Sequence, residues 1–353
     1  MSSEPANPTS SWHAFLAGRG ASLDRGRVAS FGEPRAELLA ARDGTIVADL
    51  SHNALLEVTG DDATAFLHAQ FTNDVAALPE GAAQWNGWCS AKGRLLATFL
   101  LLKRPGGYLL MLPAEIAPAI AKRLGMFVLR SKVKIGDASA RYARIGFAGK
   151  KAGVMVARHW GHVPERLRSL EVDAAACVAL DADRFVIFAP AETAPAIFDM
   201  LAENATRAGV DAWEWISIHA GIPTILAATQ DAFVPQMANF ELIGGVSFKK
   251  GCYPGQEIVA RTQYRGILKR RMALVHLDAG NATVPEPGQK VYSQAFGEQA
   301  SGEIVNVAPA PEGGADLLVV AQVESLRSGD LRLDSPGGKA LEIRSHPAAD
   351  AAP

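Results

Sequence analysis

The residues most able to do chemistry are concentrated in the segment Gly244–Arg261, which contains Cys252. Pro254 suits the first position of a helix, where its missing N–H costs nothing. Glu257 then falls in the first turn, where a negative charge meets the positive end of the helix dipole. Cys252 is therefore predicted to lie just before the N-terminus of a helix.

A cysteine in that setting reacts as a nucleophile once it is ionised. Backbone N–H groups at a helix start and the ammonium groups of Lys249 and Lys250 both favour the thiolate. The alternative is that Cys252 is a small buried hydrophobic residue beside Tyr253, with both lysines in solvent. The local sequence leaves both interpretations open.

Positive charge is concentrated in the same region. The chain has a formal net charge of −2, whereas residues 249–271 contain seven basic residues and the single acid Glu257. This imbalance predicts an attraction for anions, either a small acidic ligand or the phosphates of RNA. The overall charge and the lack of an aromatic-rich RNA motif favour the small ligand. The basic residues are Lys249, Lys250, Arg261, Arg265, Lys269, Arg270 and Arg271.

A helix and a hairpin are predicted earlier in the chain. Asp61 and Asp62 precede an apolar spacing that is typical of a capped helix. Trp85–Cys89 and Leu95–Leu102 are typical strands, joined by a turn that contains Lys92-Gly93-Arg94. The economical interpretation is a β-hairpin.

A strand followed by a helix is predicted twice, 77 residues apart. The octet Pro113–Ile120 follows the strand Tyr108–Leu112, and the octet Pro190–Ile197 follows the strand Phe185–Ala189. The octets differ at one position, so the sequence predicts two related α+β halves, residues 45–140 and 141–271. The second half carries the Cys252 motif.

The rest of the chain completes an α+β fold. Short apolar runs separated by Gly, Pro and Asn predict a small β-barrel over residues 272–345. Residues 1–44 form an N-terminal segment with a disordered start, and the tail 346–353 is also predicted to be disordered. The strands expected in the barrel are Ala273–Leu277, Lys290–Tyr292, Glu303–Val307, Leu317–Val323 and Ala340–Ile343.

Composition narrows the class of protein. With 353 residues and 48% hydrophobic content, the chain is long enough for several cores. No apolar run approaches the roughly 20 residues of a membrane span, and the polar N-terminus does not resemble a secretory signal. The three cysteines are distant and odd in number, which predicts a reducing, cytoplasmic location and no iron–sulfur cluster on this chain.

The segment Phe248–Glu257 resembles the signature of the YgfZ-type folate-binding proteins, relatives of the glycine-cleavage T-protein. The signature residues are Lys250, Gly251, Cys252, Tyr253, Gly255, Gln256 and Glu257. The resemblance extends to the stretches Phe66–Val75, Ala91–Arg94, Ala220–Pro223, Phe233–Asn239, Arg265–Gly266 and Lys269–Arg270.

This resemblance implies a T-protein-like arrangement of three domains with a C-terminal barrel and a pocket for tetrahydrofolate or a derivative. It also implies support of iron–sulfur enzymes, including those that modify tRNA. The folate, possibly polyglutamylated, would be held by Arg261, His219, Lys249 and Arg265.

The chain departs from the T-protein at two positions. An aspartate thought to be essential for aminomethyl transfer is replaced by Ala97 or Thr98, neither of which supplies a negative charge to the reacting amine. His219 replaces the glutamate that grips the pterin, and one imidazole cannot accept two parallel hydrogen bonds.

These observations favour a folate-binding accessory protein over an aminomethyltransferase. The alternatives are a folate-dependent methyl or aminomethyl transferase and a direct tRNA-binding module. No metal site is predicted, because His159 and His162 lack further ligands nearby.

Overall fold

The structure is a computed structural model that describes residues 8–265, 268–278, 280 and 284–345. The described chain divides into two compact units. The first contains residues up to Ala63 together with Leu78–Ala83 and Leu100–Trp213. The second contains Thr64–Ala77, Gln84–Phe99 and the chain from Glu214 onward.

The N-terminal segment is largely regular structure. It consists of α1 (Pro8–Gly18), the hairpin strands β1 (Ser22–Asp24) and β2 (Arg27–Ser30), and α2 (Pro34–Asp43). The predicted disordered start, residues 1–7, lies outside the described residues, as does the predicted disordered tail from residue 346.

The first α+β half forms a five-stranded sheet with the strand order β5-β6-β7-β4-β8. Strand β4 pairs antiparallel with both β7 and β8. The predicted hairpin and the predicted helix after Asp62 are both confirmed. The elements are β4 (Asn53–Thr59), α3 (Ala63–Gln70), β5 (Ala83–Cys89), β6 (Leu95–Arg104), β7 (Gly107–Pro113), α4 (Ala117–Gly125) and β8 (Lys134–Asp137).

The second half repeats this order of elements. Its sheet has the order β10-β11-β12-β9-β3-β13, which matches the first sheet except that β3 (Thr45–Asp49) is inserted before the last strand. The prediction of two related halves is therefore confirmed by topology. The elements are β9 (Tyr142–Gly149), α5 (Ala152–Trp160), β10 (Ser169–Val172), β11 (Ala175–Ala179), β12 (Arg184–Pro190), α6 (Ala194–Ala202) and β13 (Thr206–Ala208).

The repeated octets take the same course, but their helices begin later than predicted. Pro113 and Pro190 end the strands, whereas the second proline of each octet lies in the first helical turn of α4 or α6. Proline fits there because the first N–H groups of a helix have no intrahelical partner.

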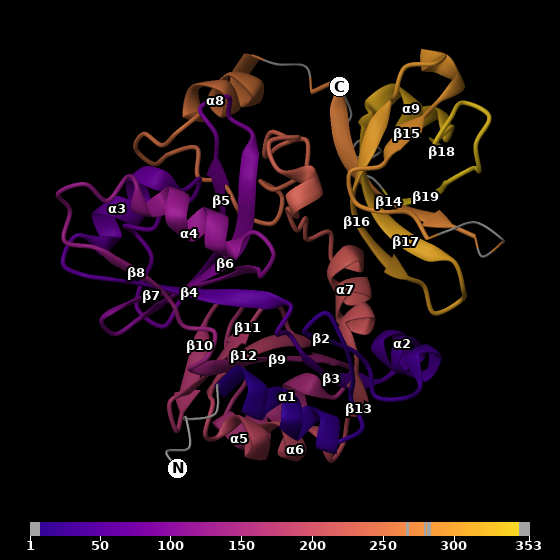
Figure 1. Ribbon diagram of the computed structural model, residues 1–353. Coiled ribbons are helices and arrows are strands. Elements are labelled where there is room, and N and C mark those ends of the chain that lie inside the picture. The colour runs from indigo at the N-terminus through magenta and orange to yellow at the C-terminus, as the bar shows by residue number, and fades with distance from the viewer. Residues whose placement is uncertain (1–7, 266–267, 279, 281–283, 346–353) are drawn as a thin grey trace, which may run out of the picture. The chain divides into compact units, whose positions relative to one another are not determined.

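The core of the first unit lies between the second sheet and the helices α1, α5 and α6, which cover one face of it (Figure 1). Strand β9 contributes Ile145 and Phe147, α6 contributes Phe198 and Leu201, and Trp12 comes from α1. The apolar alternation of the strands thus meets the apolar faces of these helices.

The second unit contains α7 (Val210–His219) from Glu214 onward, the short 3-10 helix η1 (Ala227–Thr229) and α8 (Gln256–Arg265). Between η1 and α8 the chain runs as turns without strands. This long connection carries the Cys252 motif.

The C-terminal part of the second unit is a curled antiparallel half-barrel with the strand order β18-β15-β16-β17-β14-β19 (Figure 1). The predicted barrel strands recur, but Val323 starts the helix α9 instead of ending a strand. The elements are β14 (Arg270–Leu277), β15 (Lys290–Tyr292), η2 (Gln294–Phe296), β16 (Gly302–Pro309), β17 (Ala315–Gln322), α9 (Val323–Ser328), β18 (Arg332–Leu333) and β19 (Glu342–Ser345).

Candidate functional site

Cys252 lies exposed in the loop that leads into α8. The helix starts at Gln256, so the turn at Pro254 and Gly255 separates the cysteine from the first helical residue. The prediction that Pro254 begins the helix is wrong by two residues, because Gly255 adopts a φ of +77° that ends the preceding loop. Glu257 falls in the first turn of α8, as predicted.

The loop that carries Cys252 packs closely against the turn between β5 and β6 through two glycines, Gly93 and Gly255. A Cβ on Gly255 would lie 2.4 Å from the carbonyl oxygen of Ser90 and 2.5 Å from the Cα of Gly93. A Cβ on Gly93 would in turn lie 2.9 Å from the carbonyl oxygen of Gly255. Both positions have positive φ, so glycine is required for conformation and for close approach.

The same hairpin turn is held from the other side by the segment after η1. Ser90 Oγ donates to Asp231 at 2.6 Å, and the guanidinium of Arg94 donates to the carbonyl of Ala232. Asp231 was not predicted as a site residue. The charge of Arg94 is therefore used to hold the backbone of the segment after η1. The Lys92-Gly93-Arg94 turn packs against the Cys252 loop.

Lys250 is buried and its ammonium group points into the protein. Nζ donates to the main-chain carbonyls of His68 and Phe71, the latter at 2.6 Å, and lies 4.9 Å from the ring centre of Tyr253. These carbonyls belong to the C-terminal end of α3, where a cation meets the negative end of the helix dipole. Burial lowers the pKa of Lys250 to about 8, although Asp74 and Cys252 act in the opposite direction.

The alternative interpretation, in which both lysines lie in solvent beside a buried cysteine, is wrong. Lys250 is the buried member and Lys249 is exposed. The side-chain amide of Gln256 donates to the carbonyl of Lys250 at 3.4 Å, so a second signature residue holds the same loop.

The three cysteines differ sharply in environment. Cys89 in β5 and Cys177 in β11 are buried, and Cys252 is exposed. Burial raises the pKa of Cys89 to about 12, with the charge of Asp231 acting in the same direction, and burial also raises the pKa of Cys177. Cys252 is therefore the thiol that solvent and ligands can reach.

Thr98 occupies a strand position at which the T-protein resemblance requires an acid. Its hydroxyl donates to the carbonyl of Pro223 at 2.8 Å and accepts the N–H of Ile225 at 3.1 Å. Thr98 is 4% exposed and Ala97 is fully buried. This hydroxyl joins two backbone segments, and neither residue supplies a negative charge.

His219, at the end of α7, is bound to a carboxylate of the half-barrel. Its Nε2 lies 2.7 Å from Asp316 Oδ2, the atom that also accepts the indole N–H of Trp215. His276 lies 2.7 Å from the other oxygen of Asp316. Burial alone would raise the pKa of Asp316, but hydrogen bonds from His219, His276 and Trp215 lower it to about 2.

An ionised Asp316 determines the tautomer of His219. A carboxylate only accepts hydrogen bonds, so Nε2 of His219 donates to Asp316, and in the neutral ring Nδ1 is the acceptor. The side chain borders a cavity of about 190 Å³ that Gly221, Asn239 and Met272 also line. This volume is below the roughly 300–1,000 Å³ of typical small-molecule pockets, so it suits a ring and not a whole folate.

The other residues predicted to hold folate lie on the α8 side of the second unit. Lys249 and Arg261 are exposed, and the side chain of Arg265 lies outside the described atoms. Within the part of the chain that the structure describes, no hydrogen bond or ion pair joins His219 to Lys249 or Arg261. The predicted folate residues thus come from different elements, His219 from the end of α7 and Arg261 from α8.

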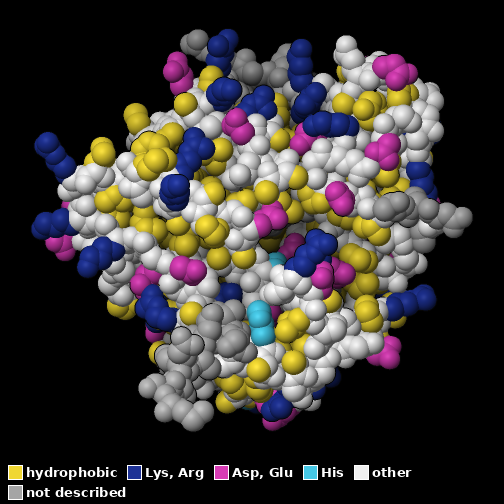
Figure 2. All heavy atoms as spheres, in the orientation of Figure 1, with side chains coloured by type: hydrophobic (Ala, Val, Ile, Leu, Met, Phe, Trp, Pro, Cys, Tyr) yellow, Lys and Arg dark blue, Asp and Glu magenta, His cyan; other side chains and the backbone are white. Residues whose placement is uncertain are grey.

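Two of the seven basic residues in 249–271 are not available to bind an anion from solvent. Lys250 is buried, and Arg271 pairs with Glu241 while donating to the carbonyl of Gln236 at 2.9 Å. Figure 2 shows Lys and Arg side chains scattered over the whole face drawn. Lys249, Arg261 and Lys269 are the exposed members with described side chains.

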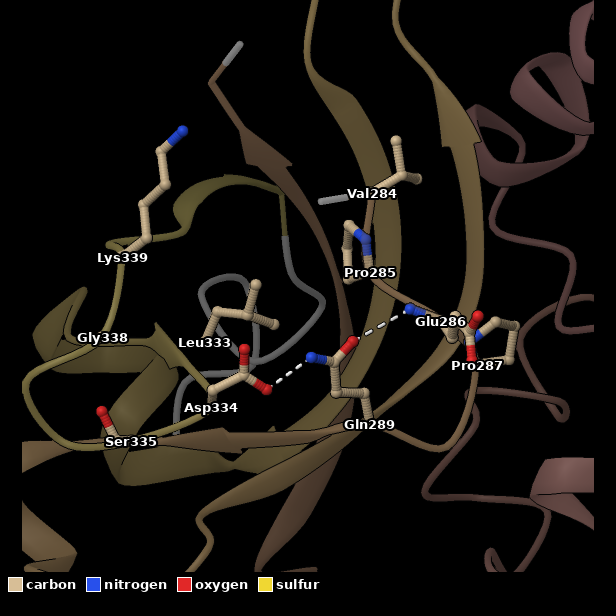
Figure 3. A pocket seen from close by; sticks show the side chains of 10 residues that line it. All are labelled: Val284, Pro285, Glu286, Pro287, Gln289, Leu333, Asp334, Ser335, Gly338 and Lys339. Atoms are coloured by element: carbon tan, nitrogen blue, oxygen red, sulfur yellow. Dashed lines mark hydrogen bonds between the residues drawn. The ribbon is translucent and has the colours of Figure 1, made fainter. Parts of the chain in front are cut away.

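A separate cavity of about 610 Å³ lies in the half-barrel. Its wall contains Gln289, which donates to Asp334 and accepts the N–H of Glu286 at 2.9 Å (Figure 3). None of the predicted site residues lines this cavity.

Comparison with known proteins identifies the relatives of the chain. The family described as the GCVT N-terminal domain matches residues 26–243. The tRNA-modifying protein YgfZ of Cronobacter sakazakii (strain ATCC BAA-894) is 32% identical over 264 residues, which cover 74% of this chain and 79% of that protein. The chain belongs to the YgfZ family.

A second relative and a solved structure agree with this assignment. The tRNA-modifying protein YgfZ of Serratia proteamaculans (strain 568) is 29% identical over 299 residues, or 83% of this chain and 89% of that protein. The crystal structure of glycine cleavage system aminomethyltransferase T from Bartonella henselae has a TM-score of 0.76 over 97% of both chains at 17% identity. The YgfZ-family chain therefore has the T-protein fold, as predicted.

Two classes of site are not found in the described ranges. No group of three or more His, Cys, Asp or Glu side chains there is arranged to hold a metal ion. No helix in the same ranges combines the length and apolar character needed to span a membrane.

Two acids that contact the site, Asp231 and Asp316, were not recognised from the sequence. Asp231 and Asp316 act across long sequence separations, which local patterns do not reveal. Asp316 did leave a signal, because it is a lone acid at the start of the apolar strand β17.

Proposed function

We propose that this YgfZ-family chain is a folate-binding accessory protein that supports iron–sulfur enzymes, including enzymes that modify tRNA. In this proposal the thiol of Cys252 is the reactive group. The observation that carries the proposal is the exposed thiol of Cys252 on a loop fixed by Gly93, Gly255 and Lys250. A reactive thiol needs access and a fixed geometry, and this loop provides both. The connection to tRNA modification comes from the relatives, which are tRNA-modifying proteins by name.

Folate binding rests on the family and on the chemistry near His219. The cavity there accommodates a ring, and Nδ1 of His219 offers one acceptor for an N–H of the pterin. Exposed Lys249 and Arg261 offer cations for a polyglutamate tail. When bound, the folate would supply one-carbon chemistry or a redox-active ring.

Aminomethyl transfer is the weaker candidate. The hydroxyl of Thr98 donates its one hydrogen to Pro223, accepts from Ile225 and carries no negative charge, so it does not take over the role of the missing acid. The T-protein fold by itself does not specify the reaction.

Complementation tests the role of Cys252. In cells that lack this protein, Cys252→Ala is expected to leave the activity of iron–sulfur enzymes at the deficient level, because the exposed thiol is lost. Cys177→Ala is the matched control, since it removes a buried thiol from strand β11. Full rescue by Cys252→Ala would refute the proposal.

Calorimetric titration of the purified chain tests the folate part. Tetrahydrofolate is expected to bind, and its polyglutamylated form more tightly. Lys249→Met combined with Arg261→Met should remove the difference between the two forms. Absence of heat with both ligands would contradict folate binding.

A further inference from the structure

The loop before Cys252 and the C-terminal end of α8 bring two aromatic side chains together. The ring centroids of Phe248 and Tyr264 lie 6.5 Å apart at an interplanar angle of 72°, which is an edge-to-face contact. Phe248 is half-buried, whereas Tyr264 is 71% exposed. An aromatic ring with most of its surface open is thus supported at the surface by a second ring.

Exposed cations flank this pair of rings. Lys249 directly follows Phe248 in the chain and is exposed. Arg261 is also exposed and lies three residues before Tyr264, a spacing that makes two side chains neighbours on a helix surface. Glu257 is the single acid of residues 249–271, so cations predominate here.

A third cation comes from the turn between β5 and β6. A Cβ on Gly93 would lie 2.9 Å from the Cβ of Ile258, so this turn lies beside α8. Lys92, the neighbour of Gly93, is exposed. The surface made of these rings and cations is called the α8 platform and consists of Lys92, Phe248, Lys249, Arg261 and Tyr264.

An open aromatic ring among cations matches the chemistry of an unpaired nucleotide. Phosphates pair with Lys and Arg, and any base can stack its face on an aromatic side chain. A duplex offers the phosphates but keeps its bases stacked inside, which leaves Tyr264 without a role. An acidic protein segment also matches the cations, but aromatic anchors of protein interfaces lie in desolvated pockets, whereas Tyr264 stands 71% exposed.

The aromatic pair changes the interpretation of the basic segment. The sequence lacks an aromatic-rich RNA motif, which favoured a small ligand over nucleic acid. Phe248 and Tyr264 are separated in the chain by the motif loop and most of α8, so only the fold brings their rings together. The structure supplies the stacking surface that the local sequence does not show.

We propose that the α8 platform binds unpaired nucleotides of a single-stranded nucleic acid. One base stacks on Tyr264, and the neighbouring phosphates pair with Lys249 and Arg261. This inference goes beyond folate binding and does not depend on it. The two cations are shared with the glutamate tail proposed above and Tyr264 is not, so substitution of the tyrosine separates the two ligands.

Fluorescence anisotropy tests the platform with a labelled oligouridylate of about ten nucleotides, titrated with the full chain at low salt. The wild type is expected to bind. Tyr264→Ala should weaken binding about tenfold, and Tyr264→Phe should keep the affinity within about twofold, because stacking needs the ring and not the hydroxyl. Lys249→Met combined with Arg261→Met should reduce the slope of log affinity against log salt by about 1.4, since each phosphate contact contributes about 0.7.

Phe127→Ala is the matched control, because it removes another exposed aromatic side chain and should leave the affinity unchanged. An oligothymidylate of the same length distinguishes the two sources of a single strand: equal binding upholds the inference for DNA and RNA, and weaker binding upholds it for RNA. Equal affinities of the wild type and folded Tyr264→Ala protein overturn the inference, with thermal unfolding as the check on folding. Absence of binding, or displacement of the oligouridylate by poly-L-glutamate as readily as by unlabelled oligouridylate, also overturns it.

Discussion

The two α+β halves share one topology but differ in what their hairpins contact. In the first half, the turn between β5 and β6 packs against the Cys252 loop through Gly93 and Gly255. In the second half, the turn between β10 and β11 is a tight two-residue turn formed by Asp173 and Ala174. The first hairpin thus supports a motif that is distant in the sequence, and the second ends in a short turn.

The first helices of the two halves differ in the same way. Helix α5 ends at Gly161, whose φ of +90° lets the chain leave the helix locally. Helix α3 instead has its last carbonyls bound by Lys250, far away in the sequence. The comparison shows that two signature residues, Lys250 and Gly255, connect the motif to the first half and place Cys252 in the open.

The largest expected effect follows from the glycine contact. Gly255→Ala should lower the free energy of unfolding by about 3 kcal/mol or more, because the new Cβ meets Ser90 and Gly93 at 2.5 Å or less. Gly106→Ala, at a similar φ of +80° with open space around it, should cost only about 1 kcal/mol. Chemical denaturation measures both losses of stability. If the two variants lose the same free energy of unfolding, the positive φ alone, and not the close contact, explains why glycine occupies position 255.

The sequence predicted much of this fold and only part of the site. Apolar alternation and proline positions located the strands and both related halves, because these signals are local. The burial of Lys250 could not be predicted, since its partners His68 and Phe71 lie about 180 residues away. A lysine beside a cysteine is typical of thiolate activation, and only the fold reveals that this one binds a helix end.

The next prediction concerns that helix end. Lys250→Met should lower the free energy of unfolding by about 2 kcal/mol at pH 7, because two buried carbonyls lose their donor. Lys249→Met removes the exposed neighbour and should change stability by less than about 0.5 kcal/mol. Equal effects of the two variants would contradict the special role of Lys250 in holding α3.

The pH dependence of the same variants gives an independent check. The pKa of Lys250 is about 8 in the folded chain and 10.5 in the reference state, so the unfolded chain binds more protons between these values. Stability of the wild type should therefore rise as pH increases from about 8 toward 10, and Lys250→Met should lose this rise. The neutral amine still has two N–H groups for the two carbonyls.

The smallest effect is expected at the free hairpin of the second half. Ala174 has a φ of +61°, which costs energy for any residue with a Cβ, so Ala174→Gly should stabilise the chain by about 0.5–1 kcal/mol. Asp173→Gly should be close to neutral, because aspartate tolerates its φ of +49°. Thermal unfolding distinguishes the two variants. Both variants should restore iron–sulfur enzyme activity as fully as the wild type does in cells that lack the protein, because neither change touches Cys252 or its loop. Loss of rescue by a variant that still folds would show that the second hairpin also contributes to the function.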